Sequence, residues 1–146
     1  MTTTVTTSPE ETQRLGRDLA HRHPGGALFY LEGDLGSGKT VFAKGIASAY
    51  GVDPDDVASP TFALVHRYGG GERPVYHVDL YRLEDERELE ELGLEDLEDE
   101  RDDKGAALIV EWAERLGRFL RPSAVVVLFE WIDDVTRNIK ILEKPQ

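Results

Sequence analysis

Residues 33–40 read Gly33-Asp34-Leu35-Gly36-Ser37-Gly38-Lys39-Thr40, which matches the pattern G-x-x-x-x-G-K-[ST] at every position. The segment before it, Ala27–Glu32, is apolar and is followed by a glycine, as expected of a buried strand. The segment after it, Lys39–Tyr50, is predicted to be a helix that ends at Gly51. A strand, a glycine-rich loop and a helix in this order form a phosphate-binding loop. The sequence therefore predicts a P-loop protein that binds a nucleoside triphosphate.

Each residue type in this loop has a physical role. Gly33, Gly36 and Gly38 can adopt backbone conformations closed to other residues, and they let backbone amides approach phosphate oxygens. The helix that begins near Lys39 directs its free N–H groups and its positive dipole end at the same anion. We expect Lys39 to contact the β- and γ-phosphates and the hydroxyl of Thr40 to bind Mg²⁺.

The rest of the chain also alternates between strand and helix patterns. Ser8 is expected to cap a first helix that ends near Pro24, and two strands around Gly69-Gly70-Gly71 are expected to form a hairpin. We expect one α/β P-loop NTPase domain over residues 1–146, with residues 1–7 flexible. Its three α/β/α layers would surround a mostly parallel sheet with an antiparallel hairpin. The further predicted strands are Phe62–Tyr68, Pro74–Leu80, Ala106–Val110, Ala124–Trp131 and an edge strand Arg137–Leu142, and the further helices are Leu83–Leu94 and Glu114–Leu120.

Composition excludes several classes of protein. The chain has 146 residues and no cysteine, so it is neither a disulfide scaffold nor a thiolate metal protein. Its longest apolar run, Ala124–Phe129, is far too short to span a membrane. The first residues lack the basic and apolar regions of a signal peptide. We therefore expect a cytoplasmic protein.

The negative charge is concentrated in one block. Residues 84–103 hold 13 acidic and two basic side chains, a net charge of −11 out of −12 for the whole chain. Such a block repels phosphates, so the sequence does not predict direct binding of nucleic acid. The block is either a solvated helix face or a docking surface for a basic partner, and the sequence leaves both open.

Other sequence features narrow the choice among P-loop proteins. A small GTPase needs a guanine-reading N-K-x-D segment, which is absent here, and a nucleotide kinase needs room for a lid. Two acids, Asp79 and Glu111, follow apolar runs at predicted strand ends. Carboxylates at such ends hold or support Mg²⁺ in P-loop folds, and Glu111 fits that pattern better than Asp79.

Four motifs together resemble one family. GDLGSGKT at 33–40, SPTF at 59–62, HVDLYR at 77–82 and VEW at 110–112 are similar, in order and spacing, to those of the TsaE (YjeE) family of bacterial P-loop ATPases. The resemblance runs from about Ser8 to Leu142. It implies an ATP-hydrolysing subunit required to make N6-threonylcarbamoyladenosine at position 37 of tRNAs, acting on the TsaB–TsaD heterodimer and meeting tRNA only indirectly.

The resemblance also implies a set of site residues. Lys39, Asp79 and Glu111 are the expected catalytic residues, and Thr40 and Glu111 are the expected Mg²⁺ ligands. Ser59–Phe62 resembles the family's switch-like segment. The match weakens beyond Trp131. The residues expected to contact ATP are Ser8, Gly33, Gly36, Ser37, Gly38, Lys39, Thr40, Val41, Thr61, Thr136 and Arg137.

Two functional classes remain open at this point. One is an ATPase whose hydrolysis drives a partner complex. The other is a non-hydrolysing adaptor that senses the nucleotide and orders a partner-binding surface. Neither a water-orienting glutamine nor an arginine finger is evident from the motifs, so slow intrinsic hydrolysis is expected in either case.

Overall fold

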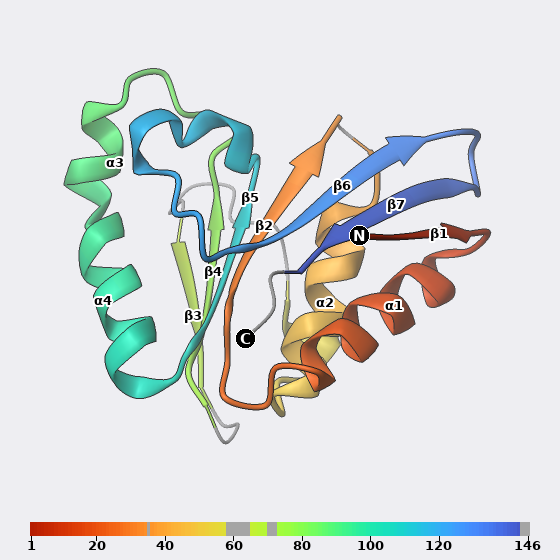
Figure 1. Ribbon diagram of the computed structural model, residues 1–146, viewed down its shortest axis with the longest axis horizontal. Helices are drawn as coiled ribbons and strands as arrows, with labels where there is room; N and C mark the ends of the chain where they lie inside the picture. Colours follow the sequence, from red (N-terminus) through yellow and green to blue (C-terminus); the bar gives the residue numbers. More distant parts are fainter. Residues whose placement is uncertain (35, 58–64, 70–72, 144–146) are drawn as a thin grey trace.

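The computed structural model describes residues 1–34, 36–57, 65–69 and 73–143, and within these ranges seven strands form one sheet (Figure 1). Across the sheet the strand order is β1-β7-β6-β2-β5-β4-β3. The elements in chain order are β1 (Thr2–Thr6), α1 (Pro9–His21), β2 (Leu28–Gly33), α2 (Lys39–Ala49), the 3₁₀ helix η1 (Pro54–Asp56), β3 (Val65–Tyr68), β4 (Val75–Asp79), α3 (Arg87–Leu92), α4 (Leu94–Lys104), β5 (Ala107–Glu111), the 3₁₀ helices η2 (Ala113–Arg115) and η3 (Gly117–Phe119), β6 (Val125–Trp131) and β7 (Arg137–Leu142).

The sheet is mixed rather than mostly parallel, which corrects the prediction. Strand β2 pairs in parallel with β5 and β6, and β5 pairs in parallel with β4. The other pairings of the described strands, β3 with β4, β6 with β7 and β1 with β7, are antiparallel. Strands β6 and β7 are joined by a short turn, which permits only antiparallel pairing. The predicted α/β class is confirmed. Strands β3 and β4 confirm the predicted hairpin, although residues 62–64 lie outside the described residues.

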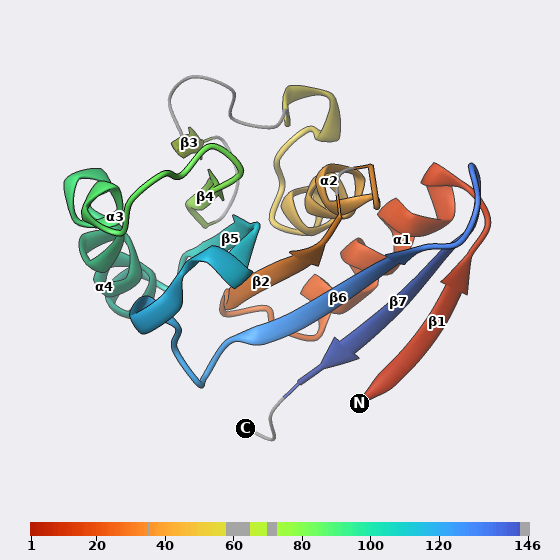
Figure 2. The ribbon, with the colours of Figure 1, turned by 90° about the horizontal axis from the view of Figure 1, so that it is seen from above.

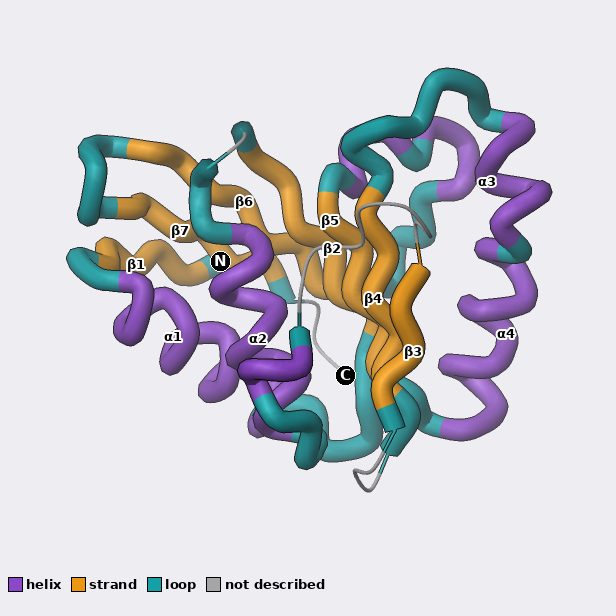
Figure 3. Tube along the Cα trace, turned by 180° about the vertical axis from the view of Figure 1, so that it is seen from behind, coloured by secondary structure: helices purple, strands orange, loops and turns teal. Residues whose placement is uncertain are grey.

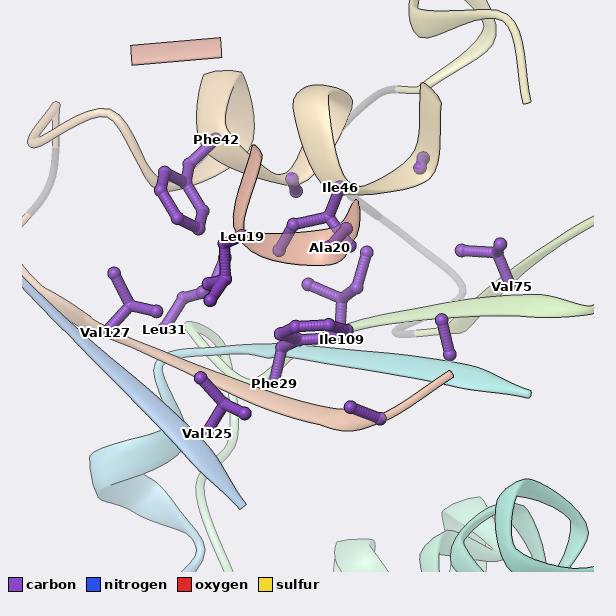
Figure 4. Close-up of a cluster of buried hydrophobic side chains, with 14 of the residues drawn as sticks. Leu19, Ala20, Phe29, Leu31, Phe42, Ile46, Val75, Ile109, Val125 and Val127 are labelled. Carbon is purple, nitrogen blue, oxygen red and sulfur yellow. The ribbon is translucent and has the colours of Figure 1, made fainter. Parts of the chain in front are cut away.

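Helices cover both faces of the sheet and give the predicted three layers. Helices α1 and α2 lie on one face, whereas α3 and α4 lie on the other (Figures 2 and 3). Successive side chains of β2 point to opposite faces: Phe29 and Leu31 join the core under α1 and α2, while Leu28 and Tyr30 join the core under α4. Figure 4 shows the first of these cores, where side chains of α1, α2 and the sheet meet, among them Leu19, Ala20, Phe42, Ile46, Ile109, Val125 and Val127.

The first residues of the chain differ from their prediction. Residues 1–7 were expected to be flexible, yet Thr2–Thr6 forms β1 and pairs along β7. Consequently β7 has a neighbour on each side and is not the edge strand that the sequence predicted. The four threonines of β1 are β-branched and favour extended backbone. The prediction missed this strand because a polar, threonine-rich segment was interpreted as flexible.

Two predicted helices are also different in the structure. The predicted helix Leu83–Leu94 is replaced by α3 and α4, which meet at Gly93. This glycine has a φ of 76°, a left-handed conformation that ends α3. The predicted helix Glu114–Leu120 is instead the pair of short 3₁₀ turns η2 and η3. Among the described residues, no helix is long and apolar enough to cross a membrane.

The acidic block spans α3 and α4. Its buried leucines, such as Leu89 and Leu97, pack on the sheet, and most of its described carboxylates face solvent. Glu98 differs because its side chain is only 3% exposed and lies beside Arg121, with Nε 2.5 Å from Oε2. Burial raises the pKa of Glu98 to about 7, even though the positive charge of Arg121 opposes the shift.

Helices α1 and α2 pack closely because glycines stand at their crossing. A Cβ atom placed on Gly45 of α2 would lie 2.9 Å from the backbone nitrogen of Arg17 and from the carbonyl carbon of Gln13. Both distances are shorter than atoms normally approach, so a side chain at this position would push the helices apart. The crossing holds α2, and with it the loop before α2, firmly against α1.

Candidate active site

The P-loop connects the end of β2 to the start of α2, as predicted. Gly33, Gly36 and Gly38 have φ values of 153°, 76° and 102°, so all three adopt the backbone conformations for which glycine was expected. Gly38 is the N-terminal cap of α2, and no side chain caps this helix. The first N–H groups of α2 therefore point toward the loop and are available to an anion. Leu35 lies outside the described residues.

Lys39 folds back over this loop. Its Nζ donates to the carbonyl oxygen of Gly33, to that of Asp34 at 2.8 Å and to Oγ of Ser37 at 3.4 Å. The residue is only 5% exposed. Burial lowers the pKa of Lys39, while the nearby carboxylates, of which Glu111 contributes most, act in the opposite direction. The ammonium group is thus held at the centre of the loop.

Thr40 and Glu111 meet beside the loop. The hydroxyl of Thr40 donates to Oε1 of Glu111 at 3.0 Å and lies 3.2 Å from Oε2. Glu111 is the last residue of β5 and is 2% exposed. Strand β5 is the neighbour of β2, so the parallel pairing delivers this carboxylate to the edge of the sheet where the P-loop begins.

Asp79 stands next to Glu111. The two residues are opposite each other in the pairing of β4 with β5, and each ends its strand. Asp79 is buried, and its Oδ1 accepts a hydrogen bond from the backbone N–H of Tyr81 at 2.9 Å. The structure therefore brings together Lys39, Thr40 and the two predicted acids.

His77, the first residue of the HVDLYR motif, was not among the expected site residues, yet it is a neighbour of the site. The residue is fully buried on β4, and its Nε2 is hydrogen-bonded to Oε2 of Glu111. Its Nδ1 lies 3.5 Å from the hydroxyl of Tyr68 on β3. A histidine in an apolar strand is typical of a packed core residue. The sequence feature that could have placed His77 in the site is its spacing from Asp79: the two are two residues apart and so share a face of β4.

A turn after β5 closes the site from the other side. Trp112 has a φ of 61° and is, among the described residues, the one non-glycine residue with a positive φ. Its ring centre lies 4.0 Å from Nζ of Lys39 and 5.1 Å from the ring centre of Tyr81, to which it is tilted by 39°. Glu114, on η2, accepts a hydrogen bond from the N–H of Gly33 at 3.3 Å. The positive φ of Trp112 is a strained conformation, which persists only where surrounding contacts enforce it. Here it directs the indole ring toward Lys39.

A second group of predicted residues lines a pocket beside the start of α2. Arg137 of β7 reaches over the loop, and its Nη2 donates to the carbonyl oxygen of Gly36 at 3.0 Å. Nε of Arg137 is buried and has no hydrogen-bond partner within the described part of the chain. Thr136 does not line the pocket, but its carbonyl oxygen accepts from Nη1 of Arg137 at 3.0 Å. The lining residues are Ser8, Pro9, Thr12, Gly38, Val41, Asp134, Val135 and Arg137.

Some predicted residues cannot be placed. Thr61 and the rest of the segment Ser59–Phe62 lie outside the described residues. Ser8, predicted as a neighbour of the nucleotide, also caps α1, where its Oγ accepts from the N–H of Glu11 at 3.1 Å.

The donor set beside the loop fits Mg²⁺. One hydroxyl and one carboxylate, both oxygen donors, lie next to each other at the start of α2, and Mg²⁺ prefers oxygen ligands. Within the described ranges, no group of three or more His, Asp or Glu side chains could hold a metal by itself.

Comparison with known proteins identifies the family. The family described as "Threonylcarbamoyl adenosine biosynthesis protein TsaE" matches residues 6–139 of this chain. The chain belongs to the TsaE family. The resemblance seen in the motifs is thereby confirmed. Strands β2 to β6 fall wholly within the matched residues, whereas most of β1 and the end of β7 lie outside them.

Individual TsaE proteins and one solved structure agree with this. The chain is 38% identical to the tRNA threonylcarbamoyladenosine biosynthesis protein TsaE of Bacillus subtilis over 134 residues, 92% of this chain and 80% of that protein. It is 34% identical to the TsaE protein of Aquifex aeolicus, covering 94% of this chain and 92% of that one. The crystal structure of Bacillus subtilis YdiB superposes with a TM-score of 0.71 at 30% identity, covering 94% of this chain and 82% of that chain.

Proposed function

We propose that this chain binds ATP with Mg²⁺, hydrolyses it to ADP and phosphate, and in doing so supports formation of N6-threonylcarbamoyladenosine in tRNA. The observation that carries the proposal is the meeting of Thr40 and Glu111 beside a buried Lys39 at the start of α2. The names of the TsaE relatives supply the pathway.

The residues around the loop would have separate roles in binding and hydrolysing ATP. Backbone N–H groups at the start of α2 bind the phosphates, and Lys39 exchanges its carbonyl partners for phosphate oxygens. Thr40 and Glu111 hold Mg²⁺, which supplies positive charge at the β- and γ-phosphates. Asp79, buried next to Glu111, orients water near the terminal phosphate.

The pocket beside α2 would take the nucleoside. It adjoins Gly38 and Val41, and therefore continues from the phosphate-binding end of α2. The unpaired Nε of Arg137 can donate to a ribose oxygen or to a ring nitrogen of adenine, while Val41 and Val135 offer apolar surface to the base. Ser8 and the neighbouring Thr136 belong to the same end of the site.

The protein partner is proposed from the family. TsaE relatives carry the name of a tRNA-modification pathway, and we propose that this chain acts on the TsaB–TsaD heterodimer. Direct contact with tRNA is disfavoured by charge, because the chain carries a net charge of −12. The triphosphate would act on Ser59–Phe62, including Thr61, since a γ-phosphate and its metal can order such segments.

An adaptor that binds ATP without hydrolysing it is the alternative. The chain has two glutamines, Gln13 and Gln146, and Gln13 lies on α1, so the glutamine that orients water in many GTPases has no counterpart in the described site. Phosphate release measured with and without TsaB–TsaD separates the two functions. Turnover that rises with the partners supports an ATPase, whereas tight ATP binding without release at any partner concentration supports the adaptor.

The partner and tRNA parts are tested separately. Capture of TsaB–TsaD by this chain should depend on ATP, and bare tRNA should bind weakly in a filter assay at physiological salt. Tight binding of tRNA alone, or partner capture that is indifferent to nucleotide, would contradict the proposal.

A further inference from the structure

The buried side chain of His77 links the candidate metal ligand to the edge of the sheet. Both His77 and Glu111 are almost completely inaccessible, and Nε2 of the histidine is hydrogen-bonded to Oε2 of the glutamate. On the other side of the ring, Nδ1 faces the hydroxyl of Tyr68 at 3.5 Å. That hydroxyl in turn lies 3.2 Å from Nδ1 of His66.

The chemistry of these four side chains, His66, Tyr68, His77 and Glu111, gives their row of hydrogen bonds one direction. An ionised carboxylate only accepts hydrogen bonds, so Nε2 of His77 must carry the proton that it shares with Glu111. With the proton on Nε2, Nδ1 is the accepting nitrogen, and the hydroxyl of Tyr68 donates to it. The oxygen of Tyr68 still accepts from Nδ1 of His66. Every donor in the row points toward Glu111.

The carboxylate is held from two sides. Thr40 donates to Oε1, and His77 donates to Oε2. Without the histidine, the carboxylate could turn about its last torsion, which is broad and only weakly restrained. A metal ligand that turns freely loses affinity, since the groups behind a ligand commonly contribute about 10- to 100-fold to metal binding.

We propose that His77 is a positioning residue: its Nε2–H fixes the carboxylate of Glu111 so that the other oxygen faces Thr40 and Mg²⁺, and Tyr68 fixes the tautomer of His77. This rests on the proposed function, because it assumes that Glu111 serves the nucleotide-bound cation. It adds the strand β3, which carries Tyr68 and His66, to the elements that shape the metal site.

A matched pair of variants separates positioning from packing. In His77→Gln, the amide nitrogen can reach the place of Nε2 and still donate to Glu111. In His77→Asn, the amide nitrogen stands near the place of Nδ1 and cannot reach the carboxylate. Both substitutions are neutral and polar, so they disturb the apolar surroundings in similar ways. Tyr68→Phe removes only the hydroxyl.

The readout is the affinity for ADP, measured by calorimetry with and without Mg²⁺, together with kcat and KM for ATP. We expect His77→Asn to lose about 10-fold or more of the affinity gained from Mg²⁺ while binding metal-free ADP like the wild type. His77→Gln should keep most of that gain, and Tyr68→Phe should lie between them. Thermal unfolding of each variant confirms that it is folded.

Two results would overturn the inference. Equal behaviour of His77→Gln and His77→Asn, or an equal loss of ADP affinity with and without Mg²⁺, would show that His77 only fills space. Failure of the proposed function would appear elsewhere, because the wild type itself would then gain no ADP affinity from Mg²⁺.

Discussion

The hydroxyl of Thr40 donates a hydrogen bond to the carboxylate of Glu111, which lies 71 residues further along the chain. The bond joins the first turn of α2 to the end of β5. It exists because β5 pairs in parallel with β2, the strand that leads into the P-loop. A hydroxyl and a carboxylate in this position can share one cation, and the first prediction tests that directly.

Glu111→Ala should lower Mg²⁺-dependent hydrolysis by about 100-fold or more and leave metal-free nucleotide binding nearly unchanged. The backbone of the loop still holds the phosphates, but the cation loses its carboxylate. Phosphate release and calorimetry measure the two effects. Normal hydrolysis in Glu111→Ala together with an inactive Asp79→Ala would show that the roles of the two acids are reversed.

Lys39→Ala should weaken ATP binding by about 10- to 100-fold, since it removes charge-assisted hydrogen bonds to phosphate. The fold should survive, because within the described part of the chain the ammonium group contacts carbonyl oxygens of the loop, Ser37 and the face of Trp112. Lys140→Ala, an exposed lysine of β7, is the charge-matched control. Equal ATP affinity in both variants would remove Lys39 from the binding site.

Stability should depend on pH through Glu98. Burial raises the pKa of its carboxyl to about 7 from an ordinary value of 4.5, so the folded state holds a proton more tightly than the unfolded chain. The resulting stabilisation is present below about pH 4.5 and is lost as the pH rises through about 7. Relative to Glu98→Gln, the wild-type free energy of unfolding should fall by about 3 kcal/mol across this window.

Urea unfolding of both proteins at several pH values measures this effect. Glu91→Gln, an exposed acid of the same block, should follow the wild type and serves as the control. Parallel curves for the wild type and Glu98→Gln would mean that Arg121 keeps Glu98 ionised across the window.

Gly45→Ala should destabilise the protein by about 1–3 kcal/mol, because the new methyl group would meet the backbone of α1. At Gly25 an added Cβ meets nothing within 4 Å and the backbone is not left-handed, so Gly25→Ala is the control. Thermal unfolding compares the two. Similar melting temperatures would mean that α1 shifts at little cost.

Much of the site could be predicted because its residues sit inside local patterns. The loop motif located Lys39 and Thr40, and an acid after an apolar run located Glu111, since parallel strands end at a common edge. The contact of His77 with Glu111 was not predicted, because a histidine in a buried strand has no local mark of its partner. Its role depends on which strand lies beside β4, and strand order is a property of the whole sheet.

The fold shows the same division. The P-loop strand and helix were predicted within a residue or two, because glycines and an apolar run mark their ends. The antiparallel direction of β1 and β7 was not predicted, since their pairing is set by distant neighbours: 130 residues of chain separate the end of β1 from the start of β7. The division of the acidic helix at Gly93 was missed because leucines continue on both sides of it.

Strand β1 has a protective consequence. In strand β7, buried Ile139 and Ile141 alternate with more exposed residues. Without β1, the backbone N–H and C=O groups on one side of β7 would be unpaired beside these apolar side chains. Such an edge recruits other chains and starts aggregation. A short threonine-rich strand covers it and leaves a polar border in its place. Preparations that lose or distort these few residues, for example through a bulky fusion at this end, should therefore suffer in solubility before they suffer in nucleotide binding.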